Sequence, residues 1–171
     1  MAEFYKVPFE QFKKDCQSIE CGGSLWFAKD DKIHEIYDSI QLPRRGEPGS
    51  AGYDFYLPFN TLFSAINPVL VPTGVGVRLN PGTFLMCVPR SGLGFRYGMR
   101  LKNTVGVIDE SYSQAENFGH IMAKIICDEG VELKAGDRFM QGIIVNYGIV
   151  DNDSPINDSR TGGFGSTGGT A

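Results

Sequence analysis

The sequence of 171 residues is poor in histidine and cysteine, and this limits the chemistry that it can carry. With only His34 and His120 available, a Ser-His or Cys-His nucleophile pair has no local support. Cys16 and Cys21 lie close together, but no second pair completes a zinc site. The other two cysteines stand in apolar runs and are expected to be buried thiols. The sequence therefore gives no support to a zinc protein.

Several familiar signatures are also missing. No apolar run approaches the roughly 18 residues of a membrane span, and residues 1–14 lack the apolar middle of a signal peptide. We therefore expect a cytoplasmic protein without membrane contact. There is no phosphate-loop motif, no G-x-S-x-G elbow and no H-E-x-x-H pair. The net charge of −4 argues against a large nucleic-acid surface, but a small anionic ligand needs only a few arginines and oriented amides.

Composition divides the chain into three regions. Residues 1–41 carry apolar side chains at spacings of three and four, which predicts one helix around residues 9–16 and another around residues 33–40. Gly22-Gly23 separates the two. Residues 151–171 are polar and rich in glycine, and they have too few apolar side chains to offset the conformational entropy lost on ordering. We therefore expect a helical N-terminal extension and a flexible C-terminal tail.

The middle region, residues 42–150, indicates many short strands. The expected strands, rich in β-branched residues, are 69–71, 75–79, 84–88, 105–108, 121–126 and 142–145. Glycine and proline punctuate them at close intervals. Parallel strands would need helical crossovers, for which this spacing leaves no room. The fold class expected is therefore all-β, a compact jelly roll or barrel.

Two of these strands end in residues suited to phosphate chemistry. Arg90, Ser91 and Gly92 follow one strand directly, and a sharp turn there would leave side chains and amides free to cradle a phosphate. A plain β-turn explains the same residues equally well. Asp109 ends another strand, where a carboxylate can hold a water as general base or merely cap a turn. Asp54 has the same ambiguity.

The C-terminal tail places Arg160 and Phe164 among glycine, serine and threonine. Arginine pairs with phosphate bidentately, phenylalanine stacks on a base, and glycines let the backbone approach a ligand closely. A flexible linker would account for the glycines alone.

Taken in order, five segments resemble the five motifs of the trimeric dUTPase family. They are 51–56, 89–94, 106–109 with Tyr112, 136–138 with Gln141, and Arg160 with 163–168. The resemblance implies a jelly-roll homotrimer with active sites at the subunit interfaces. It also implies hydrolysis of dUTP to dUMP and pyrophosphate with Mg²⁺, which keeps uracil out of DNA and supplies dUMP for dTMP synthesis.

The resemblance also implies roles for individual residues. Asp109 would activate the water that attacks the α-phosphorus, and Tyr112 would pack against the deoxyribose and exclude a 2′-hydroxyl. Asp54 would hold a water on a magnesium ion that the substrate phosphates mainly bind. The other implied substrate-binding residues are Asn103, Gly106, Val107 and Ile108 for uracil, Arg90, Ser91, Gly92 and Gln141 for phosphates, and Arg160, Phe164, Gly165 and Ser166 in a closing tail.

The third motif departs from the family pattern. An acid usually precedes its tyrosine and Arg-Gly follows it, whereas Ser111, Ser113 and Gln114 stand here, so residues 113–120 have no family role. The motifs do not explain residues 1–41 either. Such variation suits a phage or prophage enzyme. Two alternatives stay open: dCTP deaminase, a sister family with the same fold and trimer, and an added regulatory role in which the extension binds a protein partner.

Overall fold

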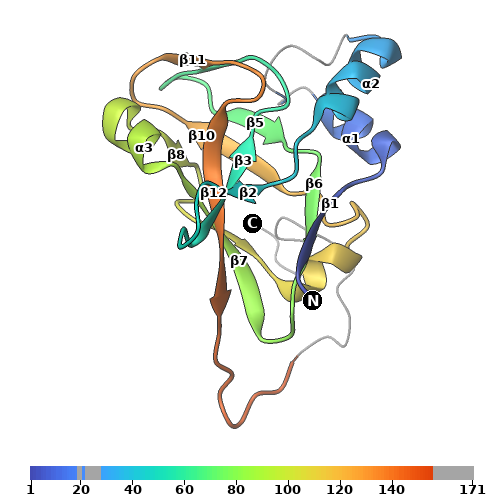
Figure 1. The fold of residues 1–171 in the computed structure, drawn as a ribbon, viewed down its shortest axis with the longest axis vertical. Coiled ribbons are helices and arrows are strands. Elements are labelled where there is room, and N and C mark those ends of the chain that lie inside the picture. The colour runs from blue at the N-terminus through green and yellow to red at the C-terminus, as the bar shows by residue number, and fades with distance from the viewer. Residues whose placement is uncertain (19–20, 22–27, 156–171) are drawn as a thin grey trace.

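The computed structural model describes residues 1–18, 21 and 28–155. Within them, short strands dominate over three α-helices and a 3₁₀-helix (Figure 1). In chain order the elements are β1 (Glu3–Lys6), α1 (Phe9–Cys16), α2 (Asp30–Ser39), β2 (Arg44–Arg45), β3 (Gly52–Tyr56), β4 (Thr61–Phe63), β5 (Val69–Pro72), β6 (Val75–Arg78), β7 (Thr83–Pro89), α3 (Ser91–Tyr97), β8 (Arg100–Leu101), β9 (Gly106–Ile108), the 3₁₀-helix η2 (Glu110–Gln114), β10 (Met122–Ile126), β11 (Val131–Leu133) and β12 (Arg138–Asn146).

The strands form small antiparallel sheets. The largest has the order β2-β3-β12-β7-β9, a second has the order β5-β10-β8, and β1-β6 and β4-β11 are pairs. All of these ladders are antiparallel, as the lack of helical crossovers led us to expect. The six expected strands correspond to β5, β6, β7, β9, β10 and β12. The jelly-roll-like all-β fold is confirmed.

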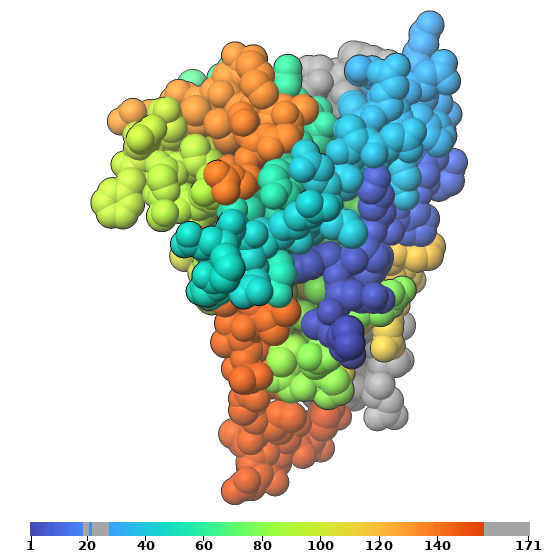
Figure 2. Space-filling view, viewed as in Figure 1, coloured from blue at the N-terminus to red at the C-terminus, as the bar shows by residue number. Residues whose placement is uncertain are grey.

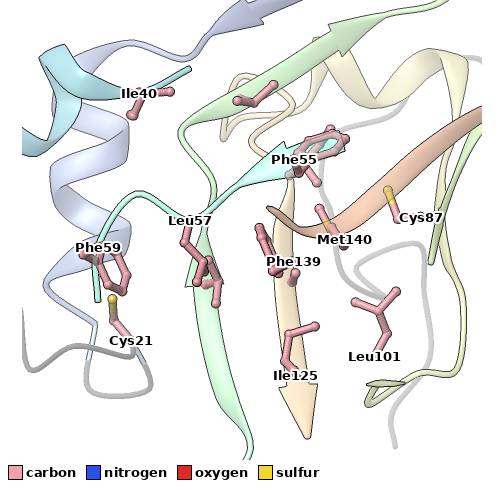
Figure 3. Packing of buried hydrophobic residues seen from close by; sticks show 14 of the residues in the cluster. Cys21, Ile40, Phe55, Leu57, Phe59, Cys87, Leu101, Ile125, Phe139 and Met140 are labelled. Atoms are coloured by element: carbon pink, nitrogen blue, oxygen red, sulfur yellow. The ribbon is translucent and has the colours of Figure 1, made fainter. Parts of the chain in front are cut away.

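The hydrophobic core lies between the sheets. In β7 the buried residues Thr83, Leu85 and Cys87 alternate with partly exposed ones, as a strand with one face toward the core requires. Figure 3 shows Phe55 and Phe139 among the side chains gathered in this core, and both are almost completely buried.

The N-terminal segment completes this core. The two expected helices are present as α1 and α2, and Phe12, Cys16 and Ile33 are fully buried in the same cluster as the strands. The first strand, β1, was not expected, because four residues are too few to establish an alternating pattern. It pairs with β6, from Glu3 opposite Arg78 to Lys6 opposite Val75 (Figure 1). The segment is thus part of the packed domain.

Replacing Phe12 by Ala is therefore expected to lower the free energy of unfolding by about 3–5 kcal/mol, because a buried ring leaves a cavity. The Phe12 ring lies against Tyr37 and His120, with ring centroids 5.8 and 6.2 Å away. Denaturant unfolding at one fixed protein concentration measures the loss. The control is Leu62→Ala on β4, where the side chain is 66% exposed and the expected change is within about 0.5 kcal/mol. Equally small losses of unfolding free energy in both variants would indicate that the N-terminal segment does not pack into the core.

The chain after β7 differs from the expected turn. Residues Ser91–Tyr97 form helix α3, and the Arg90 carbonyl accepts hydrogen bonds from the amides of Leu93 and Gly94. Gly98 ends the helix in the left-handed conformation, with φ of 60°. The sequence did not predict this helix, because two of its seven residues are glycines, which have a low helix propensity.

The C-terminal end of β12 leads away from the body of the protein. Residues 147–155 project as a narrow extension (Figures 1 and 2), and the side chains of Ile149 and Val150 are about two-thirds exposed, at 66% and 68%. The tail residues Arg160, Phe164, Gly165 and Ser166 lie outside the described residues, as does Gly22-Gly23. None of the helices in the described part of the chain has the length and apolar character needed to cross a membrane.

Candidate active site

The first candidate half-site is a cavity beside β9, which we call the β9 pocket. Its volume is about 230 Å³, and its lining residues are Cys87, Leu101, Asn103, Gly106, Val107, Ile108, Tyr112, Ile121, Met122, Ala123 and Met140. All five residues that the sequence led us to expect at uracil and deoxyribose are among them. A Cβ on Gly106 would lie 3.0 Å from the Cβ of Cys87, so glycine lets β9 pair closely with β7.

One wall of the β9 pocket is the side chain of Tyr112, which is only 4% exposed. Its hydroxyl donates a hydrogen bond to the carbonyl of His120 at 3.0 Å and accepts one from Asn117 Nδ2 at 2.7 Å. Cys87 contributes a neutral thiol to the lining, because burial raises its pKa to about 12. The pocket thus combines a fixed aromatic wall with the polar backbone of β9.

Asp109 stands directly after Ile108, the last residue of β9 and a lining residue of the pocket. It is the N-cap residue of η2, and its main-chain carbonyl accepts a hydrogen bond from the Tyr112 amide at 3.0 Å. The residue is exposed to solvent. A carboxylate at this position has access to water, as a general base requires.

The second candidate half-site is an open cavity of about 570 Å³, which we call the arginine pocket. Its lining residues are Gly46, Glu47, Ser50, Ala51, Gly52, Asp54, Arg90, Ser91, Arg138, Gln141 and Ile143. They include residues of the first, second and fourth of the five sequence segments. Asp54 on β3 and Gln141 on β12 are cross-strand partners, so their side chains point to the same face of the sheet.

Two arginines share the carboxylate of Asp54. Arg90 Nε lies 3.1 Å from Asp54 Oδ1, and Arg138 Nη1 lies 3.1 Å from Asp54 Oδ2. The Asp54 side chain is 10% exposed, while the side chains of Arg90 and Arg138 are 35% and 44% exposed. An ion pair with Arg90 and a charge-assisted hydrogen bond from Arg138 orient both arginines on a largely buried acid and leave them accessible to an anion. Arg138 was not among the residues expected at the site, although its place in the fourth segment was a usable signal.

The donor set suits a magnesium ion that arrives with a phosphate ligand. In residues 1–18, 21 and 28–155, no group of three or more His, Cys, Asp or Glu side chains is placed to hold a metal. Two carboxylates line the arginine pocket, those of Glu47 and Asp54, and the Asp54 carboxylate is already paired with Arg90 and Arg138. Mg²⁺ retains several waters and commonly combines one or two carboxylates with substrate phosphates. The expected water-mediated contact of Asp54 is compatible with this arrangement and stays a prediction.

The two pockets use opposite faces of the five-stranded sheet. Met140 lines the β9 pocket and Gln141 lines the arginine pocket, although they are consecutive residues of β12. Successive side chains of a strand point to opposite faces. The two linings share no residue. The structure thus brings the expected site residues together in two groups within one subunit.

Of the expected site residues within 1–18, 21 and 28–155, two line neither pocket: Asp109, which follows the last lining residue of β9, and Gly92. Gly92 lies in the first turn of α3, directly after Ser91, and lines neither pocket.

The dUTPase family model matches residues 38–168. The chain belongs to the dUTPase family. The match spans all five sequence segments and leaves most of the N-terminal segment, including β1 and α1, outside it.

Among curated members of the dUTPase family, the deoxyuridine 5′-triphosphate nucleotidohydrolase of Lactococcus lactis is 35% identical over 75% of this chain and 89% of its own length. The enzyme of the same name from Chromobacterium violaceum is 38% identical over 81% of this chain and 95% of its own length.

Solved dUTPase structures support the same assignment. The dUTPase of Streptococcus mutans is 38% identical, with a TM-score of 0.58 over 65% of this chain and 89% of its own. A dUTPase of Staphylococcus bacteriophage 80alpha reaches a TM-score of 0.61 over 92% of this chain and 97% of its own. At 13% identity, that likeness concerns the fold alone.

Proposed function

We propose that this protein is a dUTP diphosphatase, which hydrolyses dUTP to dUMP and pyrophosphate in the cytoplasm, or in the host cytoplasm if a phage encodes it. Such an enzyme keeps uracil out of DNA and supplies dUMP for dTMP synthesis. The observation that carries the proposal is that the sequence motifs are divided between two pockets. The third motif lines a small pocket with an aromatic wall, whereas the first, second and fourth line a pocket with two arginines.

The β9 pocket suits a deoxyuridine. Asn103 and the backbone of β9 present amide and carbonyl groups to the edge of uracil, while Tyr112 packs against the deoxyribose. A cytosine in the same place would leave buried polar groups unpaired, and such mismatches are costly. A ribose would bring a 2′-hydroxyl against the ring of Tyr112. Base and sugar selection therefore reside in one pocket.

The arginine pocket suits the triphosphate. Arg90, Ser91 and Gln141 contact phosphate oxygens, and the arginines neutralise charge that develops as the bond breaks. Asp109 accepts a proton from a water, whose oxygen forms a bond to the α-phosphorus. The bond between the α-phosphorus and the bridging oxygen breaks, and pyrophosphate leaves with the electron pair. Bound Mg²⁺ supplies further charge neutralisation on the phosphate oxygens. A dUTPase of phage phi11 is described as coordinating a structural Mg(II) ion.

A homotrimer would join the two pockets into one site. The strand β12 separates them within a subunit, so a single nucleotide reaches both only if the second pocket belongs to a neighbour. Exposed apolar side chains could form the contacts between subunits. Among them are Phe95 on α3, which is 94% exposed, and Val107 on β9, which is 56% exposed. The tail residues Arg160, Phe164, Gly165 and Ser166 would then close over the nucleotide and exclude water.

The proposed reaction is tested by hydrolysis of dUTP in water enriched in oxygen-18. Attack at the α-phosphorus predicts that the label enters dUMP and that pyrophosphate stays unlabelled. Mass spectrometry of both products measures this directly. Label in pyrophosphate would place the attack on the β-phosphorus and contradict the role given to the pockets.

Replacing Asp54 by Asn is expected to lower kcat/KM for dUTP about 10- to 100-fold, because the two arginines lose the acid that orients them. The concentration of Mg²⁺ needed for half-maximal rate should also rise, since the carboxylate is proposed to hold a water on the ion. The unfolding free energy should fall by about 1–3 kcal/mol. Steady-state kinetics over a Mg²⁺ series and denaturant unfolding measure the three effects.

The matched control is Asp128→Asn. Asp128 pairs with Arg100 at 2.7 Å, but its side chain is 61% exposed, so the expected loss of stability is at most about 1 kcal/mol. An unchanged Mg²⁺ requirement in Asp54→Asn would restrict Asp54 to holding the arginines. An unchanged kcat/KM would refute both roles.

A further inference from the structure

Residues 113–120, which depart from the family pattern, form a compact loop next to Tyr112. The amide of His120 donates to the carbonyl of Asn117 at 3.1 Å, and the amide of Gly119 donates to Asn117 Oδ1 at 3.2 Å. Phe118 and Gly119 have left-handed φ values of 57° and 67°. The side chain of Asn117 thus closes a tight turn through its oxygen and keeps its amide nitrogen for another acceptor.

The nearer acceptor is the hydroxyl of Tyr112, and the carbonyl of His120 is a second one at 3.4 Å. Asn117 Nδ2 donates to Tyr112 Oη at 2.7 Å, and the same hydroxyl donates to the His120 carbonyl at 3.0 Å. A phenol has one proton to donate, so the two bonds together fix the direction of the hydroxyl. The loop therefore holds the outer end of the ring whose body lines the β9 pocket.

The loop is itself tied to the N-terminal segment. His120 is completely buried, and its Nε2 accepts a hydrogen bond from the Gly74 amide at 2.8 Å. Because that nitrogen accepts, the ring proton resides on Nδ1, which donates to Asp15 Oδ2 at 2.6 Å. Tyr5 on β1 donates through its hydroxyl to the carbonyl of Phe118 at 2.9 Å. Two elements that the family motifs leave unexplained, β1 and α1, thus anchor the loop.

Close packing leaves the loop little freedom to move. A Cβ on Gly119 would lie 2.8 Å from the Cα of Ser113 and 3.0 Å from the carbonyl oxygen of Tyr112. Both neighbours are backbone atoms, which do not rotate aside. The loop is therefore held against the tyrosine by shape as well as by hydrogen bonds.

We propose that Asn117 is a positioning residue for sugar selection, which acts by fixing the phenol of Tyr112 as a rigid wall of the β9 pocket. The inference rests on the proposed dUTP hydrolysis and extends it. If the Tyr112 ring could shift by about an ångström, the pocket would admit the 2′-hydroxyl of a ribose. Selectivity against ribose therefore depends on how firmly the surrounding contacts hold the ring. The loop 113–120 supplies this support, and the N-terminal segment secures the loop.

The test is a double-mutant cycle with Asn117→Ala, Tyr112→Phe and the double variant. For each protein, kcat/KM is measured for dUTP and for UTP. Asn117→Ala should lower the preference for dUTP about 10-fold, mainly by improving turnover of UTP. Tyr112→Phe removes the hydroxyl from the other end of the same bond and should have a similar effect. The double variant should lose less than the sum of the two single losses, because the Asn117–Tyr112 hydrogen bond is removed by either change alone.

The matched control is Asn80→Ala, an exposed asparagine in the turn between β6 and β7, which should keep the wild-type preference. If the wild-type protein did not hydrolyse dUTP, the proposed function itself would fail. If the wild-type protein is selective and Asn117→Ala keeps its preference for dUTP, only the positioning role is overturned. Additive losses in the double variant would also overturn it. Should Asn117→Ala fail to fold, Tyr112→Phe leaves the turn intact, and unchanged selectivity in that variant would overturn the positioning role equally.

Discussion

Asp109→Asn is expected to lower kcat for dUTP about 10²- to 10⁴-fold, the usual contribution of a general base. The KM should change little, because the uracil, sugar and phosphate contacts assigned to other residues remain. The protein should stay folded, since Asp109 is exposed and the carbonyl that meets the Tyr112 amide is part of the backbone. Single-turnover kinetics with saturating enzyme measure the chemical step without interference from product release.

The matched control for this variant is Asp31→Asn, an exposed aspartate in the first turn of α2. It makes the same change in charge far along the chain from both pockets and should leave kcat unaltered. Binding of a non-hydrolysable dUTP analogue to Asp109→Asn should match that of the wild-type protein. Near-normal turnover by this variant would remove Asp109 from the role of base.

Mixed trimers of two inactive variants are expected to recover activity. If each site takes its β9 pocket from one subunit and its arginine pocket from another, Asp109→Asn and Arg90→Ala damage different halves. In random mixtures of equal amounts, about a quarter of the sites then combine two undamaged halves in a ring of three subunits. Co-expression with two affinity tags, followed by sequential purification, isolates the mixed trimers for assay.

Each variant purified alone should stay nearly inactive, which provides the baseline for this experiment. A double variant carrying both changes on one chain, mixed with wild-type subunits, keeps the number of altered residues the same and serves as the matched control. If mixed trimers of the two single variants form and show no recovery, both halves of a site belong to one subunit. That outcome would contradict the interfacial site, although not the reaction.

The sequence predicted the strands well where the pattern is local. Short runs such as residues 84–88 and 121–126 carry β-branched and apolar residues between glycines and prolines, and both became strands. The residues expected to meet a nucleoside all line one pocket, and four of them stand in one strand and the turn before it. Motif order in the chain carried this information without any knowledge of the fold.

Long-range pairing is what the sequence did not reveal. Strand β1 exists because it pairs with β6, about seventy residues away along the chain, and four residues are too few to show a pattern that predicts this pairing. The sharing of Asp54 between Arg90 and Arg138 likewise depends on β3, β7 and β12 lying side by side. The hydrogen bond from Asn117 to the Tyr112 hydroxyl depends on a turn in which two residues, Phe118 and Gly119, have left-handed backbone conformations. Non-glycine residues rarely adopt that conformation, so no propensity predicts it.

The most direct test of the proposed reaction is release of pyrophosphate from dUTP, measured in parallel with dCTP, dTTP and UTP, with Mg²⁺ and with a chelator. We expect rapid release from dUTP alone, lost when the metal is removed. That result would establish the reaction, the choice of base and the choice of sugar in one experiment. A folded trimer that releases no pyrophosphate from dUTP, or that releases ammonia from dCTP, would contradict the proposed function.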